Sequence, residues 1–519
     1  MNFNLAVILR ETALDSPGRP AILYPGGSLT YAELDGLSDL VAASLQASGI
    51  RPGDAVALQL PNIPEFVVAY FGILKAGGAA VPVNIMLKAP EVAFILGDSA
   101  AKILITWGGA LDHALTGAAS AGVSEIYAVG GSDDERAISF SRLLAVATAS
   151  GRLAERKPDD TAVIMYTSGT TGQPKGAELT HLQLYMNADV PGRLFDVQPA
   201  DVVITVLPLF HVFGLSSILN VCVRFGCTMS LIPRFDPAVV LEAIQRDRAT
   251  IFEGVPAMFI SLLSYPDLDS HDVSSLRVAI SGGASIPADV LDAFEKRFGI
   301  PVLEGYGLTE TASTVTFNKN ASDRRIYSVG KPIWGTETEI WSEDGKALPP
   351  GKDNIGEVVT RGLHVMKGYL NQAEATARAF AGGWFHTGDL GYFDEDGFLF
   401  IVGRAKELII RGGYNVYPLE IENVLRAHPA VVEAAVIGMP HERMGEEIMA
   451  VVVPRPGTQV TAPELTAFCK ERLAAYKYPR VIEFRAEMPK NTLGKVLKDE
   501  LLPAAVRSAG PRDYEGSRP

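Results

Sequence analysis

One segment constrains the fold of this chain more than any other: residues 166–176, YTSGTTGQPKG. It follows an apolar run at residues 161–165, TAVIM, which predicts a short buried strand. Glycines let the backbone turn tightly and bring its N–H groups close to an anion, hydroxyls add donors, and Lys175 adds a positive charge. The spacing is not that of the Walker loop, G-x-x-x-x-G-K-[ST]. A flexible surface loop rich in glycine and threonine is the alternative, but the density of these residues favours a loop that holds phosphate oxygens.

The patterns around this loop alternate between helix and strand. Thr30 and Glu33 form a capping-box pattern before an apolar stripe with helical spacing. Residues 54–60 and 79–83 have the pattern of strands, and residues 64–75 have that of a helix between them. This alternation predicts an α/β fold with doubly wound sheets, which bind ligands at the carboxyl ends of their strands. Further strands are expected at residues 202–206, 229–232, 250–252, 278–280 and 302–303.

From Gly330 onward the pattern changes to short, alternating strands, which predicts a small β-barrel-like subdomain. The DEDG sequence at residues 394–397 predicts a hairpin turn; a calcium loop is the alternative, but its downstream ligands are missing. A chain of 519 residues is too long for one ordinary core. We therefore expect an N-terminal domain at residues 1–403, a small α/β C-terminal domain at residues 404–510, and a disordered tail at residues 511–519.

Composition narrows the compartment and the partners. The net charge of −14 argues against nucleic acid as a partner. The three cysteines form neither a disulfide framework nor a metal-binding spacing, which fits a reducing compartment. The N-terminus lacks the features of a signal peptide, and the apolar residues 212–223 are too few to span a bilayer. We expect a cytoplasmic protein with no integral membrane segment.

Further motifs follow the phosphate loop. They are GYGLTE at residues 305–310, WFHTGD at residues 384–389, GRAK at residues 403–406 and PKNTLGKVLK at residues 489–498. Together they resemble, in order, the signature of the adenylate-forming enzymes, which include acyl-CoA and aryl-CoA ligases, firefly luciferase and the adenylation domains of peptide synthetases. The resemblance covers roughly residues 29–501. It implies an enzyme that joins a carboxylic acid to ATP as an acyl-adenylate, with Mg²⁺ and release of pyrophosphate, and then transfers the acyl group to coenzyme A.

The resemblance also implies roles for residues around the nucleotide. Tyr306 would stack on adenine, Thr309 would reach the α-phosphate, and Glu310 would bind Mg²⁺ through a carboxylate oxygen. Asp389 would accept hydrogen bonds from the ribose hydroxyls, with Arg404 beside it. The other residues expected to contact the nucleotide are Thr167, Ser168, Gly169, Thr170, Thr171, Lys175, Gly283, Ala284, Gly305 and Gly307.

The motifs nearer the C-terminus match residues of the second domain. Lys495 matches the catalytic lysine of the family, whose ammonium would bridge the carboxylate and the α-phosphate. Lys406 matches the hinge about which the C-terminal domain rotates between the two half-reactions. Gly412, Gly413 and Tyr414 match the segment that lines the channel for the CoA thiol, and the two glycines also indicate a tight turn.

The acyl pocket is expected around the sequences PLFHVFG and SGGA, at residues 208–214 and 281–284. His211 matches the family position next to the substrate carboxylate. Residues that match pocket-lining positions are Phe213, Ser217, Met258 and Gly282. They are apolar or small, and no aspartate near His211 could hold an amino group, which favours a plain carboxylic acid over an amino acid.

We therefore expect a medium- or long-chain fatty acid as the substrate. An aryl acid such as a coumarate or benzoate is the nearest alternative, because residues 356–370 resemble 4-coumarate-type ligases as much as fatty-acid ligases. Loading of a carrier protein, luciferase-like oxygenation and a non-catalytic nucleotide sensor are further alternatives; the presence of Lys495 and Glu310 argues against the sensor. The expected partners are the carboxylic acid, ATP and CoA, and the sequence leaves a homodimer open.

Overall fold

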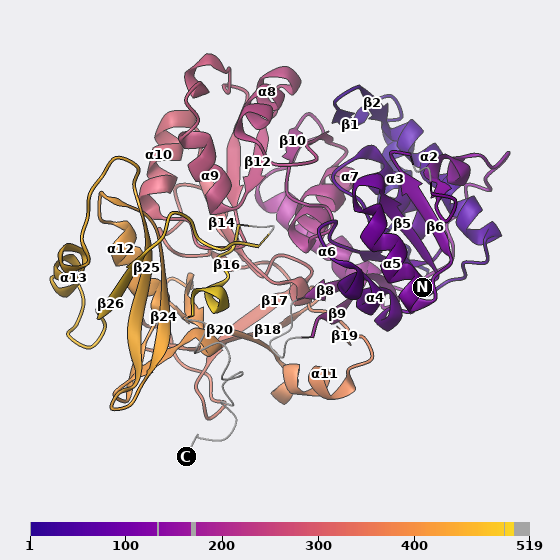
Figure 1. Cartoon of the computed structure of the whole chain (residues 1–519). Helices are drawn as coiled ribbons and strands as arrows, with labels where there is room; N and C mark the ends of the chain where they lie inside the picture. The colour runs from indigo at the N-terminus through magenta and orange to yellow at the C-terminus, as the bar shows by residue number, and fades with distance from the viewer. Residues whose placement is uncertain (1, 132–133, 168–172, 492–493, 503–519) are drawn as a thin grey trace. The chain divides into compact units, whose positions relative to one another are not determined.

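The computed structural model describes residues 2–131, 134–167, 173–491 and 494–502 (Figure 1). The chain forms two compact units. The N-terminal unit consists of Met1–Ser285, Asp292–Thr338 and Val359–His386, and the C-terminal unit of Ile286–Leu291, Glu339–Val358 and Thr387–Pro519. The tail expected at residues 511–519 lies outside the described residues.

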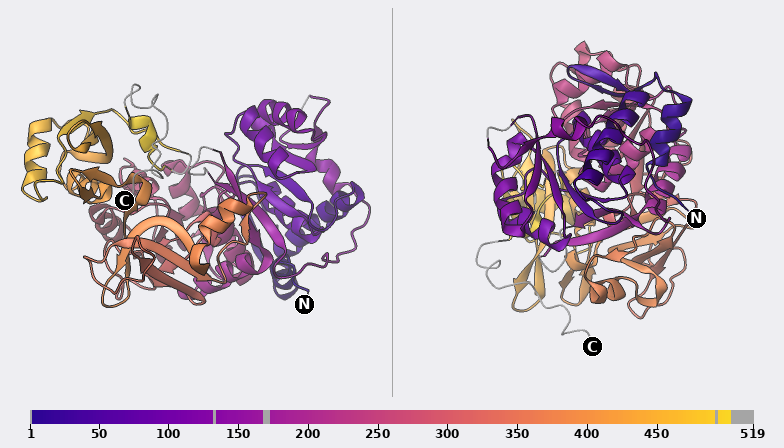
Figure 2. Two further views of the ribbon diagram at one scale, coloured as in Figure 1. Left: turned by 90° about the horizontal axis from the view of Figure 1, so that it is seen from below. Right: turned by 90° about the vertical axis from the view of Figure 1, so that its right-hand side faces the viewer.

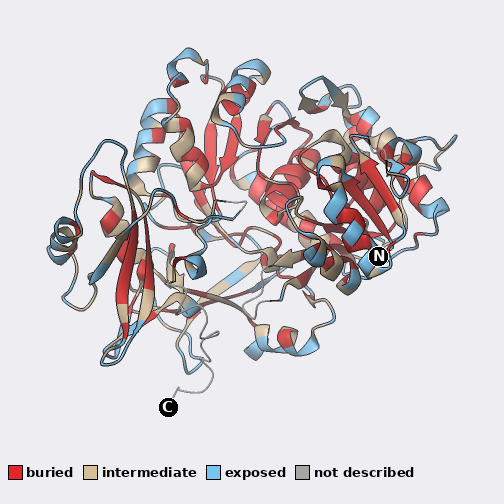
Figure 3. Ribbon diagram, viewed as in Figure 1, coloured by how far each residue is buried: buried red, intermediate tan, exposed pale blue. Residues whose placement is uncertain are grey.

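The N-terminal unit contains a nine-stranded sheet in the order β16-β15-β14-β13-β12-β10-β11-β1-β2. Its central part, from β1 to β14, is parallel, as the alternation of helices and strands predicts. Most residues of these strands are buried (Figure 3), because a parallel sheet is covered on both faces. The strands are β1 Pro20–Tyr24, β2 Gly27–Thr30, β10 Val202–Thr205, β11 Thr228–Leu231, β12 Ile251–Gly254, β13 Val278–Ser281, β14 Val302–Tyr306, β15 Thr316–Phe317 and β16 Lys331–Pro332.

An eight-stranded sheet completes the unit, in the order β19-β9-β8-β4-β3-β5-β6-β7. The strands β8 and β9 pair antiparallel, so the phosphate-loop segment joins two adjacent strands and does not lead into a helix. The strands of this sheet are β3 Ala55–Gln59, β4 Ala79–Pro82, β5 Ile103–Trp107, β6 Glu125–Val129, β7 Ile138–Ser139, β8 Thr161–Thr167, β9 Lys175–Thr180 and β19 Gly368–Tyr369.

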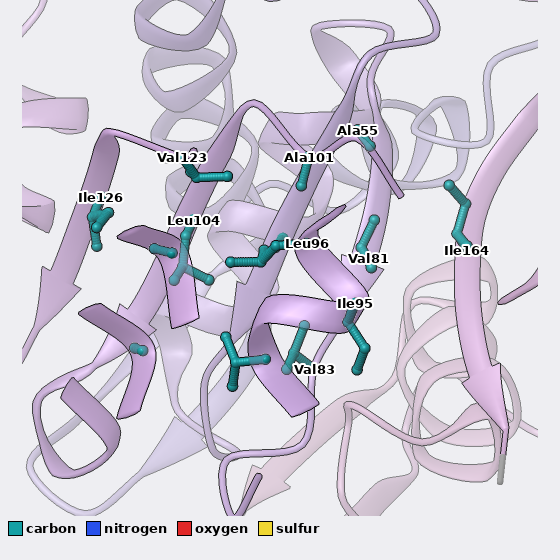
Figure 4. Close-up of a cluster of buried hydrophobic side chains, with 14 of the residues drawn as sticks. Ala55, Val81, Val83, Ile95, Leu96, Ala101, Leu104, Val123, Ile126 and Ile164 are labelled. Carbon is teal, nitrogen blue, oxygen red and sulfur yellow. The ribbon is translucent and has the colours of Figure 1, made fainter. Parts of the chain in front are cut away.

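Helices cover these sheets through apolar faces. Leu96 of α4 and Ala118 of α5 pack with Leu104 of β5 in a buried cluster (Figure 4). The helix α2 starts with the predicted capping box, since Thr30 N donates to Glu33 Oε2 at 2.8 Å and Glu33 N donates to Thr30 Oγ1 at 3.2 Å. The helices are α1 Val7–Asp15, α2 Tyr31–Ala47, α3 Pro64–Lys75, α4 Ala89–Asp98, α5 Leu111–Ala121, α6 His181–Leu194, α7 Val221–Phe225, α8 Pro237–Asp247, α9 Pro256–Leu263, α10 Ala288–Phe298 and α11 Ala373–Ala379.

A four-stranded sheet, in the order β17-β18-β20-β21, contains the strands through which the chain passes from one unit to the other. Its strands are β17 Thr336–Trp341, β18 Gly356–Gly362, β20 Phe385–Phe393 and β21 Leu399–Arg404. The hairpin predicted at residues 394–397 is confirmed: β20 and β21 pair antiparallel, and Gly397 has a φ of +80°.

The rest of the C-terminal unit is a five-stranded sheet, in which β23-β22-β25-β24 are consecutive and β26 pairs with β25. Ile421 of α12 and Leu465 of α13 pack against buried residues of β24 and β25, such as Val436 and Val452. This part of the chain is drawn in orange to yellow in Figure 2. The elements are β22 Ile409–Arg411, β23 Tyr414–Val416, α12 Pro418–Arg426, β24 Val431–His441, β25 Gly445–Pro454, α13 Ala462–Lys470 and β26 Val481–Phe484.

Candidate functional site

The phosphate-loop segment begins and ends on a well-anchored pair of strands. Thr167 of β8 lies opposite Lys175 of β9. The Tyr166 hydroxyl donates to Asp98 Oδ2 at 2.6 Å, which fixes β8 to the end of α4. The predicted phosphate ligands Ser168, Gly169, Thr170 and Thr171 lie outside the described residues. The structure therefore shows the two strands that carry this loop, with Thr167 and Lys175 at its two ends.

Tyr369 connects Lys175 to Glu310, two residues that the sequence assigns to different motifs. The Lys175 ammonium lies 5.1 Å from the centre of the Tyr369 ring, within the range of a cation–π contact. The Tyr369 hydroxyl donates to Glu310 Oε1 at 3.0 Å. Burial, followed by the Glu310 charge, raises the pKa of Tyr369 above its usual value, so the phenol stays protonated and can donate. The sequence gives no partner for Tyr369, and its role is visible only once β19 pairs with β9.

Packing fixes the backbone of the second motif. A Cβ on Gly307 would lie 1.4 Å from the Ser313 carbonyl oxygen, so only glycine fits there. The Glu310 carbonyl accepts a hydrogen bond from Met366 N at 2.7 Å, and the buried Asn187 amide donates to the Thr311 and Thr314 carbonyls at 3.2 and 2.9 Å. Gly305 and Tyr306 end β14, and Thr309 and Glu310 form a short 3₁₀ turn after it. The motif is thus a rigid turn whose carboxylate is held by β19.

The residues expected around the acyl group also lie in the N-terminal unit. A Cβ on Gly282 would lie 2.9 Å from the Phe213 ring, so these two predicted pocket residues are in contact. Ser217 is on the π-helix Phe213–Asn220, and its Oγ lies 2.7 Å from Ser313 Oγ. This contact links the predicted acyl pocket to the turn that carries Glu310. Met258 is buried on α9, whereas Gly283 and Ala284 are exposed after β13.

His211 is a neutral side chain at the start of this helix. Its Nδ1 accepts a hydrogen bond from Phe213 N at 3.2 Å, so the proton of the neutral ring is on Nε2. Burial lowers the pKa of His211 to about 4. A neutral imidazole can donate one hydrogen bond from Nε2 to a carboxylate oxygen without trapping it as an ion pair.

Charged residues gather around Lys495 in the C-terminal unit. Arg404 Nε lies 3.1 Å from Asp389 Oδ1, and the two residues are opposite each other on β21 and β20. Lys495 is exposed, but surrounding protein partly desolvates its ammonium; this burial, followed by the Arg404 charge, lowers its pKa, while Glu407 and Asp389 oppose the shift. The structure therefore brings together three predicted residues, Lys495, Asp389 and Arg404.

Lys498 is a partly buried ion-pair partner, a role that could not be predicted from its position in a lysine-rich segment. Its ammonium lies 2.9 Å from Glu407 Oε2 and 2.8 Å from Glu422 Oε1. Glu422 in turn accepts a hydrogen bond from Val436 N at 2.9 Å, within the core of the five-stranded sheet. Lys498 thus ties the segment that carries Lys495 to the sheet and to the residue after the expected hinge, Lys406.

The segment that is expected to line the channel for the CoA thiol forms a tight hairpin. Gly412 and Gly413 join β22 to β23 with φ values of +59° and +82°, as a two-residue turn of type I′ requires. The Tyr414 ring is exposed and stacks on Tyr476, with ring centres 4.7 Å apart. Lys406 lies in the 3₁₀ turn Ala405–Glu407. The prediction that Gly412 and Gly413 form a tight turn is thereby confirmed.

The described residues hold no cluster of three or more histidine, cysteine, aspartate or glutamate side chains that could bind a metal by itself. Mg²⁺ binds through few protein carboxylates and completes its shell with phosphate and water. The single carboxylate of Glu310, positioned by Tyr369, fits an ion that arrives with a nucleotide. No helix in the described part of the chain is both long and apolar enough to cross a membrane.

Comparison with known proteins identifies the family. Residues 9–370 match the AMP-binding enzyme family, and residues 420–495 match the C-terminal domain of AMP-binding enzymes. The chain belongs to the AMP-binding enzyme family. This confirms the resemblance to adenylate-forming enzymes and identifies the chain as an AMP-forming acid–thiol ligase.

Three relatives illustrate the range of this family. A long-chain-fatty-acid–CoA ligase of Bacillus subtilis (strain 168) is 36% identical, over 96% of this chain and 94% of that protein. A feruloyl-CoA synthase of an Amycolatopsis species is 38% identical, over 94% of this chain and 96% of that protein. The crystal structure of the anthranilate CoA ligase AuaEII in complex with anthranoyl-AMP superposes with a TM-score of 0.92 at 30% identity, covering 98% of this chain and 97% of that one.

Proposed function

We propose that the protein is an ATP-dependent acyl-CoA ligase that acts on a medium- or long-chain fatty acid. It would form an acyl-adenylate, release pyrophosphate, and transfer the acyl group to the CoA thiol with release of AMP. The observation that carries this proposal is the group Lys175, Tyr369 and Glu310, in which a single tyrosine contacts the end of the phosphate loop and the acid of the second nucleotide motif.

In the N-terminal unit, this group would hold the triphosphate. When the triphosphate binds, the Lys175 ammonium would move from the Tyr369 ring to the phosphate oxygens, because a full negative charge attracts it more strongly than the face of an aromatic ring. Glu310, kept in place by the Tyr369 hydroxyl, is the residue that would hold Mg²⁺, which supplies charge neutralisation on the phosphates when bound. Tyr306 and Thr309, on the same rigid turn, would contact the adenine and the α-phosphate.

In the C-terminal unit, the ion pair of Asp389 and Arg404 would contact the ribose hydroxyls. Lys495, beside this pair, would stabilise the negative charge that moves between the carboxylate and the α-phosphate. We place the boundary of the mobile domain between residues 403 and 404, which leaves Asp389 outside that domain although it belongs to the same compact unit, and we place the hinge at Lys406. The exposed hairpin Gly412–Gly413–Tyr414 would then line the thiol channel in the second half-reaction.

For the acid, the contact of Phe213 with Gly282 and the buried Met258 support a mainly apolar site. His211 would donate from Nε2 to the substrate carboxylate. The fatty-acid ligase of Bacillus subtilis supports a fatty acid, whereas the feruloyl-CoA synthase and the anthranilate CoA ligase support an aryl acid as the second candidate. A cytoplasmic setting, which supplies ATP and CoA, fits either substrate.

Pyrophosphate release tests this proposal. The purified protein is incubated with ATP and Mg²⁺ and with acetate, octanoate, palmitate, malonate, benzoate or 4-coumarate, each with and without CoA. We expect sustained release with octanoate or palmitate only when CoA is present. Sustained release with benzoate or 4-coumarate alone would establish the aryl acid, and a burst that CoA does not extend would point to a carrier protein as the acceptor. No release with any acid would contradict the proposal.

A further inference from the structure

Glu253 is a buried carboxyl group that no role described so far explains. It lies on β12, next to the last residue of the strand, and is 2% exposed. Its Oε2 has no hydrogen-bond partner among the described residues. Burial of a carboxyl group without a hydrogen bond is costly, so such groups are rare in protein cores and usually have a functional reason.

The packing of β12 shows on which face of the nine-stranded sheet Glu253 lies. Side chains alternate along a strand, and the neighbouring Phe252 packs against Phe259 of α9 and Phe294 of α10, with ring centres 5.2 and 6.2 Å apart. Glu253 must therefore point to the other face. The pKa of the Cys222 thiol on α7 is raised by burial, then by Cys227 and by Glu253, which places Glu253 near the helix that continues the π-helix of residues 213–220.

The same face leads to the expected acyl pocket. Glu253 lies directly opposite Ile280 in the register of β12 and β13. Gly282 follows Ile280 by two residues, directly after the end of β13, and it is in contact with the Phe213 ring. Ser216, on the π-helix that Phe213 begins, is also fully buried, and its Oγ has no partner among the described residues. A buried polar atom without a partner thus lies on the strand next to β13, which Gly282 follows, and another lies on the π-helix that carries Phe213.

We propose that Glu253 forms a hydrogen bond with a hydroxyl group on the acyl part of the substrate. This inference rests on the proposed acyl-CoA ligase function and narrows its acid, whether a fatty acid or the aryl second candidate, to one that carries a hydroxyl group. Burial raises the pKa of Glu253 well above its usual value, and no cation contributes to that shift. Burial therefore favours the neutral carboxyl group, which has one O–H donor and one carbonyl acceptor, and this pair is complementary to a hydroxyl.

A hydroxyl can come from two kinds of acid, a phenolic acid or a hydroxy fatty acid. Both present an uncharged donor and acceptor at the end of an otherwise apolar group, as the surroundings of Glu253 require. An ammonium group would instead need an ionised carboxylate, which this apolar layer disfavours. A site that is built to bind a hydroxyl discriminates strongly against the analogue without one, because its own polar groups are then left unpaired.

The test compares pairs of acids that differ by one hydroxyl: 4-coumarate with cinnamate, and 8-hydroxyoctanoate with octanoate. Pyrophosphate release with CoA gives kcat/KM for each acid with the wild-type protein, Glu253→Gln and Glu253→Leu. We expect the wild-type protein to favour the hydroxylated member of one pair by about tenfold or more. Glu253→Gln, which keeps a donor and an acceptor, should retain the preference, and Glu253→Leu should lose it or reverse it. Thermal unfolding verifies that each variant is folded.

Two results would overturn the inference. One is the same ratio of kcat/KM in the wild-type protein and in Glu253→Leu for both pairs, which would make Glu253 a structural acid. The other is a wild-type preference for 8-aminooctanoate over 8-hydroxyoctanoate, which would indicate an ionised carboxylate. Should no acid release pyrophosphate, the proposed function fails separately. Calorimetric Kd values for the same pairs of acids then test the role of Glu253 alone. Equal Kd values for the acids with and without the hydroxyl, in both the wild-type protein and Glu253→Leu, would overturn the inference.

Discussion

The two units hold their candidate site residues by different physical means. In the N-terminal unit, Glu310 lies on a turn fixed by packing at Gly307 and by hydrogen bonds from Asn187, and its carboxylate accepts from a neutral tyrosine. In the C-terminal unit, charges dominate: Asp389 pairs with Arg404, and Lys498 pairs with Glu407 and Glu422.

This difference suits the steps proposed for each unit. Steric packing and hydrogen bonds from uncharged donors depend less on salt than ion pairs do, so they keep a binding site in one geometry. Ion pairs with partly exposed members respond to salt and to nearby charge, such as a nucleotide that arrives or leaves. We infer that the N-terminal unit is preorganised for the triphosphate, whereas the charges around Lys495 rearrange during the reaction.

The largest effect should come from Lys495→Ala. Loss of a preorganised charge at the reacting centre should lower the rate of acid-dependent pyrophosphate release by roughly 10²–10³. Stability should not change, because the side chain is exposed. Lys490→Ala is the matched control from the same segment; its ammonium pairs with Glu433, and its rate should stay near that of the wild type. Near-normal release from Lys495→Ala would refute the catalytic assignment.

Lys498→Ala tests whether charge holds the C-terminal unit together. Removal of Lys498 leaves the partly buried carboxylates of Glu407 and Glu422 without this cation, and since Lys498 is 21% exposed we expect a loss of about 1–3 kcal/mol in the free energy of unfolding. Urea denaturation measures this loss. The control is Lys346→Ala, which removes an exposed ion pair with Asp344 in the same unit and should have no measurable effect. Equal stability of the two variants would show that the Lys498 pairs contribute nothing.

Tyr369→Phe probes the preorganisation of the N-terminal unit. Removal of a hydrogen bond to a charged group should weaken Mg²⁺-ATP binding by about tenfold and raise the Mg²⁺ concentration needed for half-maximal rate. The matched control is Tyr127→Phe, which removes a 2.6 Å hydrogen bond from a tyrosine to Glu125 away from the site and should leave the Mg²⁺ dependence unchanged. The same Mg²⁺ dependence in both variants would exclude a positioning role for Tyr369.

The smallest effect expected is a difference between the two units in how their stability depends on pH. Burial lowers the pKa of His181 to about 3 and of His364 to about 4, so each binds a proton more readily when unfolded. The stability that they contribute to the N-terminal unit is therefore lost as the pH falls from about 6.5 towards 4, by about 1 kcal/mol per pH unit for each. Glu253, whose pKa burial raises, offsets part of this loss, because its carboxyl group binds a proton more readily in the folded protein.

In the C-terminal unit, Glu407 and Glu447 have pKa values held below the usual 4.5, and their contribution is lost only below that pH. Pulse proteolysis mapped by mass spectrometry at pH 7, 5.5 and 4.5 should show cleavage appearing first in the N-terminal unit. Cleavage that appears first in the C-terminal unit would contradict this order.

Much of the fold could be predicted from the sequence. The predicted helix at residues 64–75 coincides with α3, and the predicted strand at residues 278–280 lies within β13, because both are runs bounded by strong local signals. The phosphate-loop segment also had a local signature. What the local pattern could not supply is its context, an antiparallel hairpin completed by β19 from almost two hundred residues further along the chain.

The parts that escaped prediction depend on contacts between distant segments. Nothing in the sequence distinguishes Tyr369 from the other tyrosines, of which the chain has 16 in all; its contact with Glu310 exists only because β19 lies beside β9 in the folded protein. Lys498 belongs to a lysine-rich stretch of the kind that is usually solvated, and only the folded unit shows it between two carboxylates. Glu253 lies on a strand, and its burial depends on the register of that strand in the sheet and on the helix that covers it.

The most direct test of the central claim is detection of the intermediate. Stoichiometric protein is mixed with ATP, Mg²⁺ and a substrate acid without CoA, quenched, and analysed by mass spectrometry; CoA is then added to a parallel sample. We predict close to one acyl-adenylate per protein before CoA is added, and its conversion to acyl-CoA and AMP afterwards. Acyl-CoA formed without a detectable acyl-adenylate, or ATP cleavage that does not depend on the acid, would contradict it.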